Sequence, residues 1–220
     1  MNIGILGAGR MTKALAEKWI AAGHDVCISG RTSDKAEALA NELGPQATFG
    51  TFQEAVAFGD TLLIAVRHEG VVSTLEQAGA STGSFQGKVL IDCSNPVEIE
   101  NFTLVGNEKN SMAERIQTTA KGATVVKAFN LCEAQVWEMK PPSFDDRKLV
   151  VPYCADTDTA ASIGSRLITD VGCQPMLLGD LRYARHLEAM AAIVISQLFS
   201  GVDPHSVFNW ITPNPEAIKG

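Results

Sequence analysis

The chain has 220 residues, of which 45% are hydrophobic and 20% are charged, so its composition is that of a globular protein and excludes general disorder. Asp and Glu number 25 against 18 Lys and Arg, giving a formal net charge of −7. This acidic balance lacks the basic footprint of a nucleic-acid-binding protein. The apolar stretch Ala189–Ile195 is far shorter than the roughly 20 residues of a membrane span, so we expect no membrane partner either.

The cysteines and the N-terminus indicate the compartment. Five cysteines are scattered without a C-x-x-C pair or the spacing of zinc ligands. Their odd number and their apolar surroundings favour reduced thiols over a disulfide framework. No basic segment precedes the apolar run that begins at Ile3, so a signal peptide is not recognisable. We therefore expect a cytoplasmic protein without a bound metal.

Short β-branched runs alternate with helical patterns through the first hundred residues. Strands are expected at Asn2–Leu6, Val26–Ser29, Thr61–Val66 and Val89–Asp92. The last two are continuous apolar runs, which are typical of central parallel strands covered on both faces. Helices are expected at Met11–Ala22, Ser33–Leu43 and Gly70–Ala80, the second of them capped by Ser33 and ended by Gly44-Pro45.

The second half continues the alternation and ends differently. Further strands are expected at Thr124–Ala128, Leu149–Cys154 and Gln174–Leu178, with a helix at Asp156–Thr169. Pro96–Lys109 and Glu133–Arg147 are interpreted as loops over a ligand cleft. Apolar residues spaced three and four apart predict one long helix at Leu181–Ser200.

The alternation of strands and helices predicts an α/β protein with a doubly wound parallel sheet of the Rossmann type. We expect residues 1–180 to form this dinucleotide-binding domain. Residues 181–220 then form a small C-terminal helical extension that packs over the cleft or at a dimer interface. An apolar tail on a small domain needs a partner surface, which favours a homodimer.

A glycine-rich segment lies between the first expected strand and the first expected helix. It reads Gly7-Ala8-Gly9-Arg10-Met11-Thr12. In a dinucleotide-binding turn the first glycine permits the tight turn and the second lets a pyrophosphate approach the backbone. The N-terminus of the following helix then favours the anion. Thr12 replaces the third small residue, so the match is incomplete. All six residues are candidates for cofactor binding.

The end of the second expected strand indicates which dinucleotide is bound. NAD-binding proteins place Asp or Glu about 20 residues beyond the glycines, where it bonds the ribose 2′-hydroxyl. No carboxylate occupies this strand end, and Arg31 can donate charge-assisted hydrogen bonds to a 2′-phosphate. The other cofactor-binding candidates here are Ser29, Thr32, Ser33 and Lys35. The pattern favours NADP over NAD.

Several segments together resemble the coenzyme F420-dependent NADP oxidoreductase family. They are Gly7–Thr12, Gly30–Glu37, Val89–Pro96, Val125–Asn130, Val171–Pro175 and Gly179–Leu181, so the resemblance spans almost the whole chain. The family includes enzymes that pass hydride between a reduced deazaflavin and NADP, and ferric-reductase-type relatives that use a flavin. The resemblance implies direct hydride transfer between two stacked rings, with no obligatory acid or base and hence no assigned catalytic side chain.

The resemblance also implies where the nicotinamide end of the cofactor lies. The family pattern places candidates at the ends of three central strands, namely Ala65, Val66, Asn95, Pro96, Ala128 and Asn130. His68, in the loop after one of these strands, departs from the family pattern and is a further candidate. It either donates to a cofactor phosphate or a flavin carbonyl or is a solvated loop residue. These positions agree with the rule that ligands bind outside the carboxyl ends of parallel strands.

Three functions remain open from the sequence. The first is an NADPH-dependent oxidoreductase with a small-molecule electron acceptor, namely a flavin or deazaflavin such as coenzyme F420. The second is an imine or hydroxyacid reductase of the pyrroline-5-carboxylate reductase type, whose N-terminal pattern is similar to Ile5–Met11. The third is a non-catalytic module that senses NADP(H).

Overall fold

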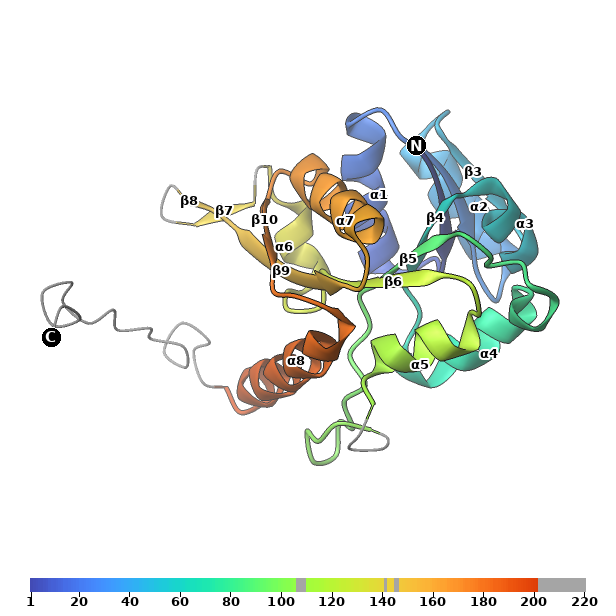
Figure 1. The fold of residues 1–220 in the computed structure, drawn as a ribbon. Coiled ribbons are helices and arrows are strands. Elements are labelled where there is room, and N and C mark those ends of the chain that lie inside the picture. Colours follow the sequence, from blue (N-terminus) through green and yellow to red (C-terminus); the bar gives the residue numbers. More distant parts are fainter. Residues whose placement is uncertain (106–109, 141, 145–146, 202–220) are drawn as a thin grey trace, which may run out of the picture.

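An eight-stranded sheet forms the centre of the computed structural model, which describes residues 1–105, 110–140, 142–144 and 147–201 (Figure 1). The strands are β1 (Asn2–Leu6), β2 (Asp25–Ser29), β3 (Ala47–Gly50), β4 (Thr61–Ile64), β5 (Val89–Asp92), β6 (Thr124–Lys127), β9 (Val150–Ala155) and β10 (Gln174–Leu177). Their order across the sheet is β10-β9-β6-β5-β4-β1-β2-β3. Because the chain starts at β1 and builds outward in both directions, the predicted doubly wound α/β fold is confirmed.

The direction of the last two strands differs from the expectation of a wholly parallel sheet. β1 to β6 are parallel, whereas β9 pairs antiparallel with β6 through Val126↔Ala155 and Lys127↔Cys154. β10 then pairs parallel with β9. Apolar patterning shows that a segment is a strand but carries no information on its direction. The connection from β6 to β9 decides it, and that connection carries the hairpin of β7 (Ser143–Phe144) and β8 (Arg147–Lys148).

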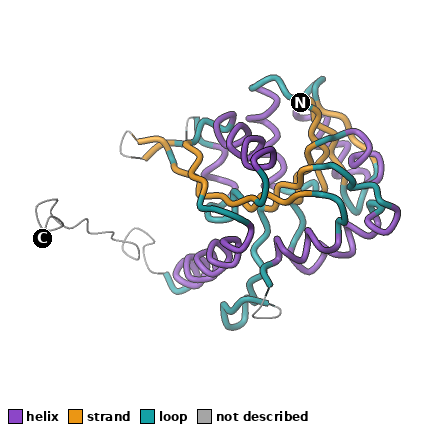
Figure 2. Tube along the Cα trace, viewed as in Figure 1, coloured by secondary structure: helices purple, strands orange, loops and turns teal. Residues whose placement is uncertain are grey.

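Helices cover both faces of the sheet. They are α1 (Arg10–Ala21), α2 (Ser33–Leu43), α3 (Phe52–Phe58), α4 (Val71–Gln77), α5 (Met112–Thr119), α6 (Ala134–Glu138), α7 (Asp158–Asp170) and α8 (Ala184–Phe199). In the view of Figures 1 and 2, α1 and α7 lie above the sheet and α4, α5 and α8 lie below it. None of the helices in the described residues is long and apolar enough to cross a membrane.

The side chains of alternate strand residues pack into two separate hydrophobic clusters, one on each face of the sheet. Ile3, Ile5 and Leu63 point to the cluster that contains Trp19 of α1. Leu62 and Ile64 point to the opposite cluster, below α3, α4 and α5. All these residues are fully buried. This two-sided burial explains why the central strands read as continuous apolar runs rather than as alternating patterns.

Residues 47–58 form a strand and a helix that the apolar pattern did not predict. β3 is an edge strand with two exposed residues, so its sequence lacks a buried run. α3 begins with a capping box. Thr51 Oγ1 accepts from the N–H of Glu54, and the Glu54 carboxylate accepts from the N–H of Thr51 at 2.7 Å. A second capping box, of Ser111 and Glu114, opens the unpredicted α5. The T-x-x-E and S-x-x-E spacings were available signals for both helices.

The interpretation of Glu133–Arg147 as a loop over a ligand cleft is wrong. This segment contains α6 and runs into the β7–β8 hairpin, and α6 packs on α1. Trp137 of α6 is buried and meets Phe129 edge-to-face, with ring centroids 5.3 Å apart. Phe129 meets Trp19 in the same way at 6.1 Å. The aromatic contacts therefore pack this segment into the core beside Phe129, just after the end of β6.

The segment Pro96–Lys109 is described through residue 105, and its last four residues lie outside the described part. Val97 and Leu104 form an isolated antiparallel bridge, and the N–H of Val105 donates to the carbonyl of Pro96 at 2.7 Å. Residues 96–105 thus form a small hairpin, here called the 96–105 hairpin. Its Phe102 contacts Phe199 at the end of α8, with ring centroids 5.4 Å apart.

The expected C-terminal helix begins with a short 3-10 helix at Leu181–Tyr183 and continues as α8. α8 packs against α5 and β9 through buried residues that include Leu187 and Ala191. Of the predicted segment 181–220, residues 202–220 lie outside the described part of the chain. The division of the chain after residue 180 stays a prediction.

Candidate functional site

A pocket of about 370 Å³ opens at the carboxyl ends of the central parallel strands. Three groups of residues line it: the turn after β1, the loop after β4, and the segment after β5 together with one residue of α8. They are Gly9, Arg10, Met11, Ala65, Val66, Arg67, His68, Glu69, Cys93, Ser94, Asn95, Val97, Ile99 and Ile195. β1 and β4 are neighbours, and the chain leaves them toward opposite edges of the sheet. The pocket therefore lies at a topological switch point, where open α/β sheets bind ligands.

The turn after β1 requires a glycine at its first position. Gly7 has φ 128°, and a Cβ there would lie 2.3 Å from the carbonyl oxygen of Ala65 at the end of β4. Its N–H donates to the carbonyl of Ser29 at 2.8 Å, and its own carbonyl accepts from the hydroxyl of Thr12 at 2.8 Å. Thr12 is fully buried, so this hydrogen bond stabilises the turn from its buried side.

Gly9 leaves the start of α1 open. A Cβ on Gly9 would meet no atom within 4 Å, and Gly9 is the N-cap without a side-chain hydrogen bond to the helix. The first turn of α1 contains no acidic residue. Backbone N–H groups at the positive end of the helix dipole therefore have no acidic side chain in their own helical turn, an arrangement suited to an anion.

The end of β2 lies beside this turn. A Cβ on Gly30 would lie 3.4 Å from Cβ of Ala8, which places the end of β2 in van der Waals contact with the turn. Ser29 is fully buried and its hydroxyl donates to the carbonyl of Ile5 at 2.7 Å. The Ser29 side chain thus joins β2 to β1, and its assignment to cofactor binding stays a prediction. Arg31 is exposed at this strand end.

The N-cap of α2 differs from the expectation. The predicted cap was Ser33, whereas Thr32 occupies the cap position with φ −121° and makes no side-chain hydrogen bond to the helix. Thr32, Ser33 and Lys35 are exposed together with Arg31. Their side chains are accordingly accessible to a ligand that extends from the turn after β1 toward the end of β2.

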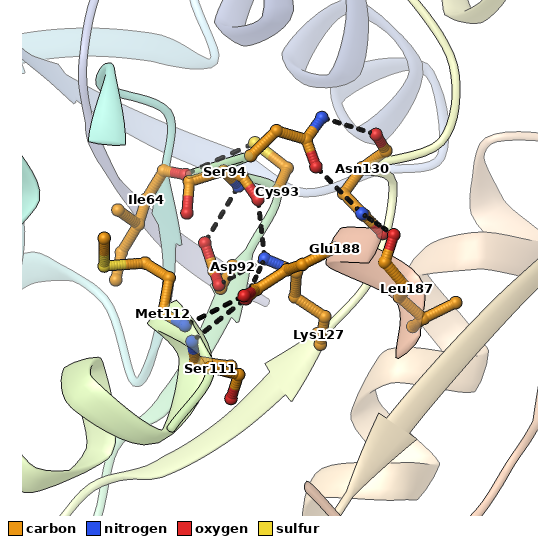
Figure 3. A network of polar contacts seen from close by, with 12 residues as sticks. Ile64, Asp92, Cys93, Ser94, Ser111, Met112, Lys127, Asn130, Leu187 and Glu188 are labelled. Carbon is orange, nitrogen blue, oxygen red and sulfur yellow. Dashed lines mark hydrogen bonds and ion pairs between the residues drawn. The ribbon is translucent and has the colours of Figure 1, made fainter. Parts of the chain in front are cut away.

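A buried ammonium group lies below the pocket, at the ends of β5 and β6 (Figure 3). Lys127 Nζ donates to Asp92 Oδ2 at 2.8 Å and to the carbonyl of Ser94 at 2.6 Å. It also lies 3.0 Å from Glu188 Oε1 of α8. The side chains of Lys127 and Asp92 have no exposed surface and that of Glu188 is 2% exposed. The group of Lys127, Asp92 and Glu188, here called the Lys127 cluster, joins two strands and a helix.

Glu188 also caps α5. Its Oε2 accepts from the N–H of Met112 at 3.0 Å and its Oε1 accepts from the N–H of Ala113 at 3.3 Å. Every contact of this carboxylate is therefore with a donor: one ammonium and two backbone N–H groups. The arrangement satisfies a buried anion, which would otherwise be costly.

A second network joins the same elements beside the Lys127 cluster. Asn95 and Asn130 pair reciprocally: Asn95 Nδ2 donates to the carbonyl of Asn130 at 2.7 Å, and Asn130 Nδ2 donates to Asn95 Oδ1 at 2.9 Å. Asn130 Nδ2 also donates to the carbonyl of Leu187 in α8 at 3.0 Å. Within the described residues, Asn130 Oδ1 and Ser94 Oγ are buried without a hydrogen-bond partner.

Burial and neighbouring charge shift the pKa values of this region. Burial raises the pKa of Glu188 above its ordinary value, and the Lys127 ammonium opposes that shift. Burial acts to lower the pKa of Lys127, but the carboxylates of Asp92 and Glu188 outweigh it and raise that pKa. Burial, helped by the charge of Asp92, raises the pKa of Cys93 to about 12. The Cys93 thiol is therefore protonated at neutral pH and unsuited to act as a nucleophile.

The structure brings many of the sequence candidates to the pocket and leaves others outside its lining. Those that line the pocket are Gly9, Arg10, Met11, Ala65, Val66, His68 and Asn95. Gly7, Ala8 and Thr12 shape the turn from behind, and Pro96, Ala128 and Asn130 are buried next to the strand ends. Their assignment to cofactor binding stays a prediction. His68 Nδ1 lies 3.7 Å from Glu69 Oε2 at the pocket wall.

The sequence did not predict the apolar residues that line the pocket from the 96–105 hairpin and α8, nor the carboxylates of the Lys127 cluster. Val97 and Ile99 reach the pocket from the 96–105 hairpin, and Ile195 reaches it from α8. Asp92 and Glu188 received no role. The available signal was a single charged residue at the end of, or inside, an otherwise apolar run. Within the described residues no group of His, Cys, Asp or Glu side chains could hold a metal ion, and all five cysteines are free thiols.

The sequence around the turn after β1 is similar to that of known proteins. The family model for "NADP oxidoreductase coenzyme F420-dependent" matches residues 2–96. Metalloreductase STEAP3 of Rattus norvegicus is 31% identical over 189 residues, which is 86% of this chain and 36% of that protein. The chain thus spans about a third of the length of this curated relative.

Solved structures match the whole architecture. A protein from Arthrobacter sp. FB24, assigned as an F420-dependent NADP reductase, superposes with a TM-score of 0.80 at 24% identity and covers 91% of this chain and 95% of its own. An imine reductase from Aspergillus terreus, in complex with NADPH4 and dibenz[c,e]azepine, gives a TM-score of 0.62 at 23% identity and covers 91% of this chain and 60% of its own. At these identities the likeness establishes the fold.

The family match ends at Pro96, so it includes the turn after β1, the exposed end of β2, and the segments after β4 and β5 that line the pocket. These segments form the pocket at the switch point, beside the open start of α1. Over residues 2–96 the chain is similar to the coenzyme F420-dependent NADP oxidoreductase family.

Proposed function

We propose that this protein binds NADP(H) in the pocket at the switch point and transfers a hydride between the nicotinamide and a flavin or deazaflavin. The observation that carries the proposal is the juxtaposition of the Gly7–Thr12 turn with the segments after β4 and β5 in one pocket. The pyrophosphate position follows from the open start of α1, and the nicotinamide position from the neighbouring strand ends.

The residues present fit such a cofactor. The close approach of Gly7 to Ala65 and the open space at Gly9 form a turn that a dinucleotide can approach along its backbone. Ser94 Oγ and Asn130 Oδ1, which are buried without partners in the described residues, lie near the expected nicotinamide end. Arg31 is exposed at the end of β2, where a 2′-phosphate is recognised by charge-assisted hydrogen bonds.

NADPH supplies the hydride, and the protein supplies position. Met11, Val97, Ile99 and Ile195 give the pocket an apolar wall, which suits a flat ring better than a small charged metabolite. Hydride transfer between two held rings depends on distance and orientation and does not require a protein acid. The proposal therefore assigns no proton transfer to the lining residues, although His68 and Glu69 lie 3.7 Å apart among them.

The test is a titration of the purified protein with NADPH and with NADH, followed by addition of an acceptor. We expect NADPH to bind more tightly than NADH and to be oxidised only when flavin mononucleotide or coenzyme F420 is present. Oxidation with a cyclic imine in place of both would assign the protein to the imine reductases. Tight binding without turnover on any of these acceptors would favour a sensing module, and absence of NADPH binding would refute the proposal.

Reversal of the charge at Arg31 is expected to remove the preference for NADPH. In Arg31→Glu the Kd for NADPH should rise about 10- to 100-fold, because charge-assisted hydrogen bonds to the 2′-phosphate are replaced by repulsion. The Kd for NADH should change less than about threefold, since NADH has no phosphate at that position. Both values can be measured by fluorescence titration.

The matched control is Lys121→Glu. Lys121 is exposed just before β6, which lies four places from β2 in the sheet, so the variant carries the same change in net charge far from the end of β2. An equal rise in the NADPH Kd of both variants would mean that only overall charge matters and that Arg31 does not contact the 2′-phosphate.

A further inference from the structure

α8 makes its polar contacts to the pocket region through two consecutive residues. The carbonyl of Leu187 accepts from Asn130, which in turn holds Asn95. The carboxylate of Glu188 contacts Lys127, which in turn holds the carbonyl of Ser94. The Lys127 cluster and the asparagine pair therefore both connect this one point of α8 to the Ser94–Asn95 segment that lines the pocket (Figure 3).

The same face of α8 continues to the pocket itself. Ile195 follows Glu188 by two helical turns, and residues seven apart lie on the same face of a helix. Glu188 lies at the Lys127 cluster and Ile195 at the pocket wall. The position of α8 at Glu188 thus sets both the lateral position of Ile195 and the backbone of Ser94–Asn95.

We propose that Glu188 is a positioning residue that fixes Ile195 of α8 relative to the Ser94–Asn95 segment across the pocket. It holds α8 in one register on the ends of β5 and β6, so that Ile195 on one side and Ser94–Asn95 on the other keep the two reacting rings in contact. The inference rests on the proposed hydride transfer. It assigns a role to a residue that does not itself line the pocket.

The chemistry of the cluster supports a positioning role over simple adhesion. A helix that only needed to adhere to the sheet could bury an apolar side chain at this position, often with equal or greater stability. A carboxylate surrounded by three donors, at 3.0 to 3.3 Å, is satisfied in one arrangement and leaves an unpaired buried charge in any other. Such a contact selects one register of α8.

The test variant is Glu188→Gln, which keeps the shape of the side chain. All three partners of Glu188 are donors. The amide of glutamine has one acceptor oxygen and one donor NH₂ group, so the NH₂ group meets a donor and the hydrogen bonds to one of the two carboxylate oxygens are lost. The matched control is Asp156→Asn. Asp156 also holds the C-terminal region, because its Oδ1 accepts from the N–H of Leu181 at 2.8 Å and its Oδ2 accepts from Gln117 at 2.9 Å, but it does not contact the Lys127 cluster.

Three measurements are made on the full chain: the rate of hydride transfer, the Kd for NADPH and hydrogen exchange. In single-turnover mixing with flavin mononucleotide or coenzyme F420, Glu188→Gln should slow hydride transfer about 10- to 100-fold, since small displacements of reacting groups have effects of this size. The Kd for NADPH should change less than about threefold, whereas Asp156→Asn should leave both values near those of the wild type. Hydrogen exchange should be faster in Glu188→Gln at the α8 amides and at the N–H of Ser94, which donates to Asp92 Oδ1 at 2.9 Å.

The outcomes separate this inference from the proposed function. If the wild type fails to bind or oxidise NADPH, the proposed function falls, and hydrogen exchange still tests the link between α8 and Ser94. Faster exchange confined to α8, or hydride transfer at the wild-type rate in a folded Glu188→Gln protein, would overturn the positioning role. Loss of hydride transfer to the same extent in Asp156→Asn would also overturn it.

Discussion

Lys127→Met is expected to lower the free energy of unfolding by about 3–5 kcal/mol, the range measured when one partner of a buried ion pair is removed. The Lys127 ammonium is the only cation of the Lys127 cluster and separates two carboxylates, those of Asp92 and Glu188. Methionine matches the length of the lysine stem but leaves these anions buried without a counter-charge. Chemical denaturation followed by circular dichroism measures the change.

Two further variants identify the cause of this loss. Lys121→Met removes an exposed lysine and should change stability by less than about 0.5 kcal/mol. In the combined variant Asp92→Asn, Lys127→Met and Glu188→Gln, no charge remains in the cluster, so part of the stability should return. A single variant as stable as the wild type, or a neutral triple variant less stable than the single one, would contradict the ion-pair account.

The same cluster predicts how stability changes at alkaline pH. The folded-state pKa of Lys127 lies above its ordinary value. The contribution of the charged Lys127 to the free energy of unfolding is therefore fully present below the unfolded-state pKa of about 10.4. It is lost as the pH rises through the folded-state pKa. Lys127→Met should lack this alkaline decline, which denaturation curves recorded from neutral pH upward would reveal.

Gly7→Ala is expected to disturb both the fold and the nucleotide site. The new Cβ would lie 2.3 Å from the carbonyl oxygen and 2.7 Å from the carbonyl carbon of Ala65, and φ at this position is 128°. The turn after β1 must then move away from the end of β4. We expect a loss of about 1–3 kcal/mol of stability from the strained backbone, and a rise in the NADPH Kd of at least about tenfold, or 1.4 kcal/mol.

Gly9→Ala separates the two effects. Its Cβ would meet no atom within 4 Å, so the variant should unfold like the wild type. The methyl group would nevertheless occupy the space through which a pyrophosphate approaches the backbone, and NADPH binding should weaken. Thermal unfolding and fluorescence titration of both variants test this. Normal NADPH affinity in Gly9→Ala would show that the turn does not hold the pyrophosphate.

The parts of the fold that the sequence predicted are those with strong local signals. Thr61–Ile64 and Val89–Asp92 are buried on both faces and read as apolar runs, while the glycines after β1 follow from the backbone geometry of one turn. The edge strand β3 lacks such a run. The antiparallel direction of β9 depends on a long connection, so neither feature is encoded within a single segment.

The candidate site divides in the same way. The turn and the strand ends around Ala65 and Asn95 could be placed because the ends of neighbouring parallel strands meet at one edge of the sheet. The wall could not, because Ile195 reaches the pocket only through the packing of α8. Glu188 resembles an ordinary surface charge in the sequence. Its partners, Lys127 and the N–H groups of α5, are brought to it by tertiary structure alone.

The aromatic contacts around Phe129 give the protein an internal optical reporter. Trp19 and Trp137 are both buried and flank Phe129, the residue immediately before Asn130. Two indoles in apolar surroundings emit at short wavelength, where the emission overlaps the absorption of reduced nicotinamide. Replacement of Trp210, which lies outside the described residues, leaves these two as the only tryptophans. Quenching of their fluorescence on addition of NADPH then measures occupancy of the pocket without a label.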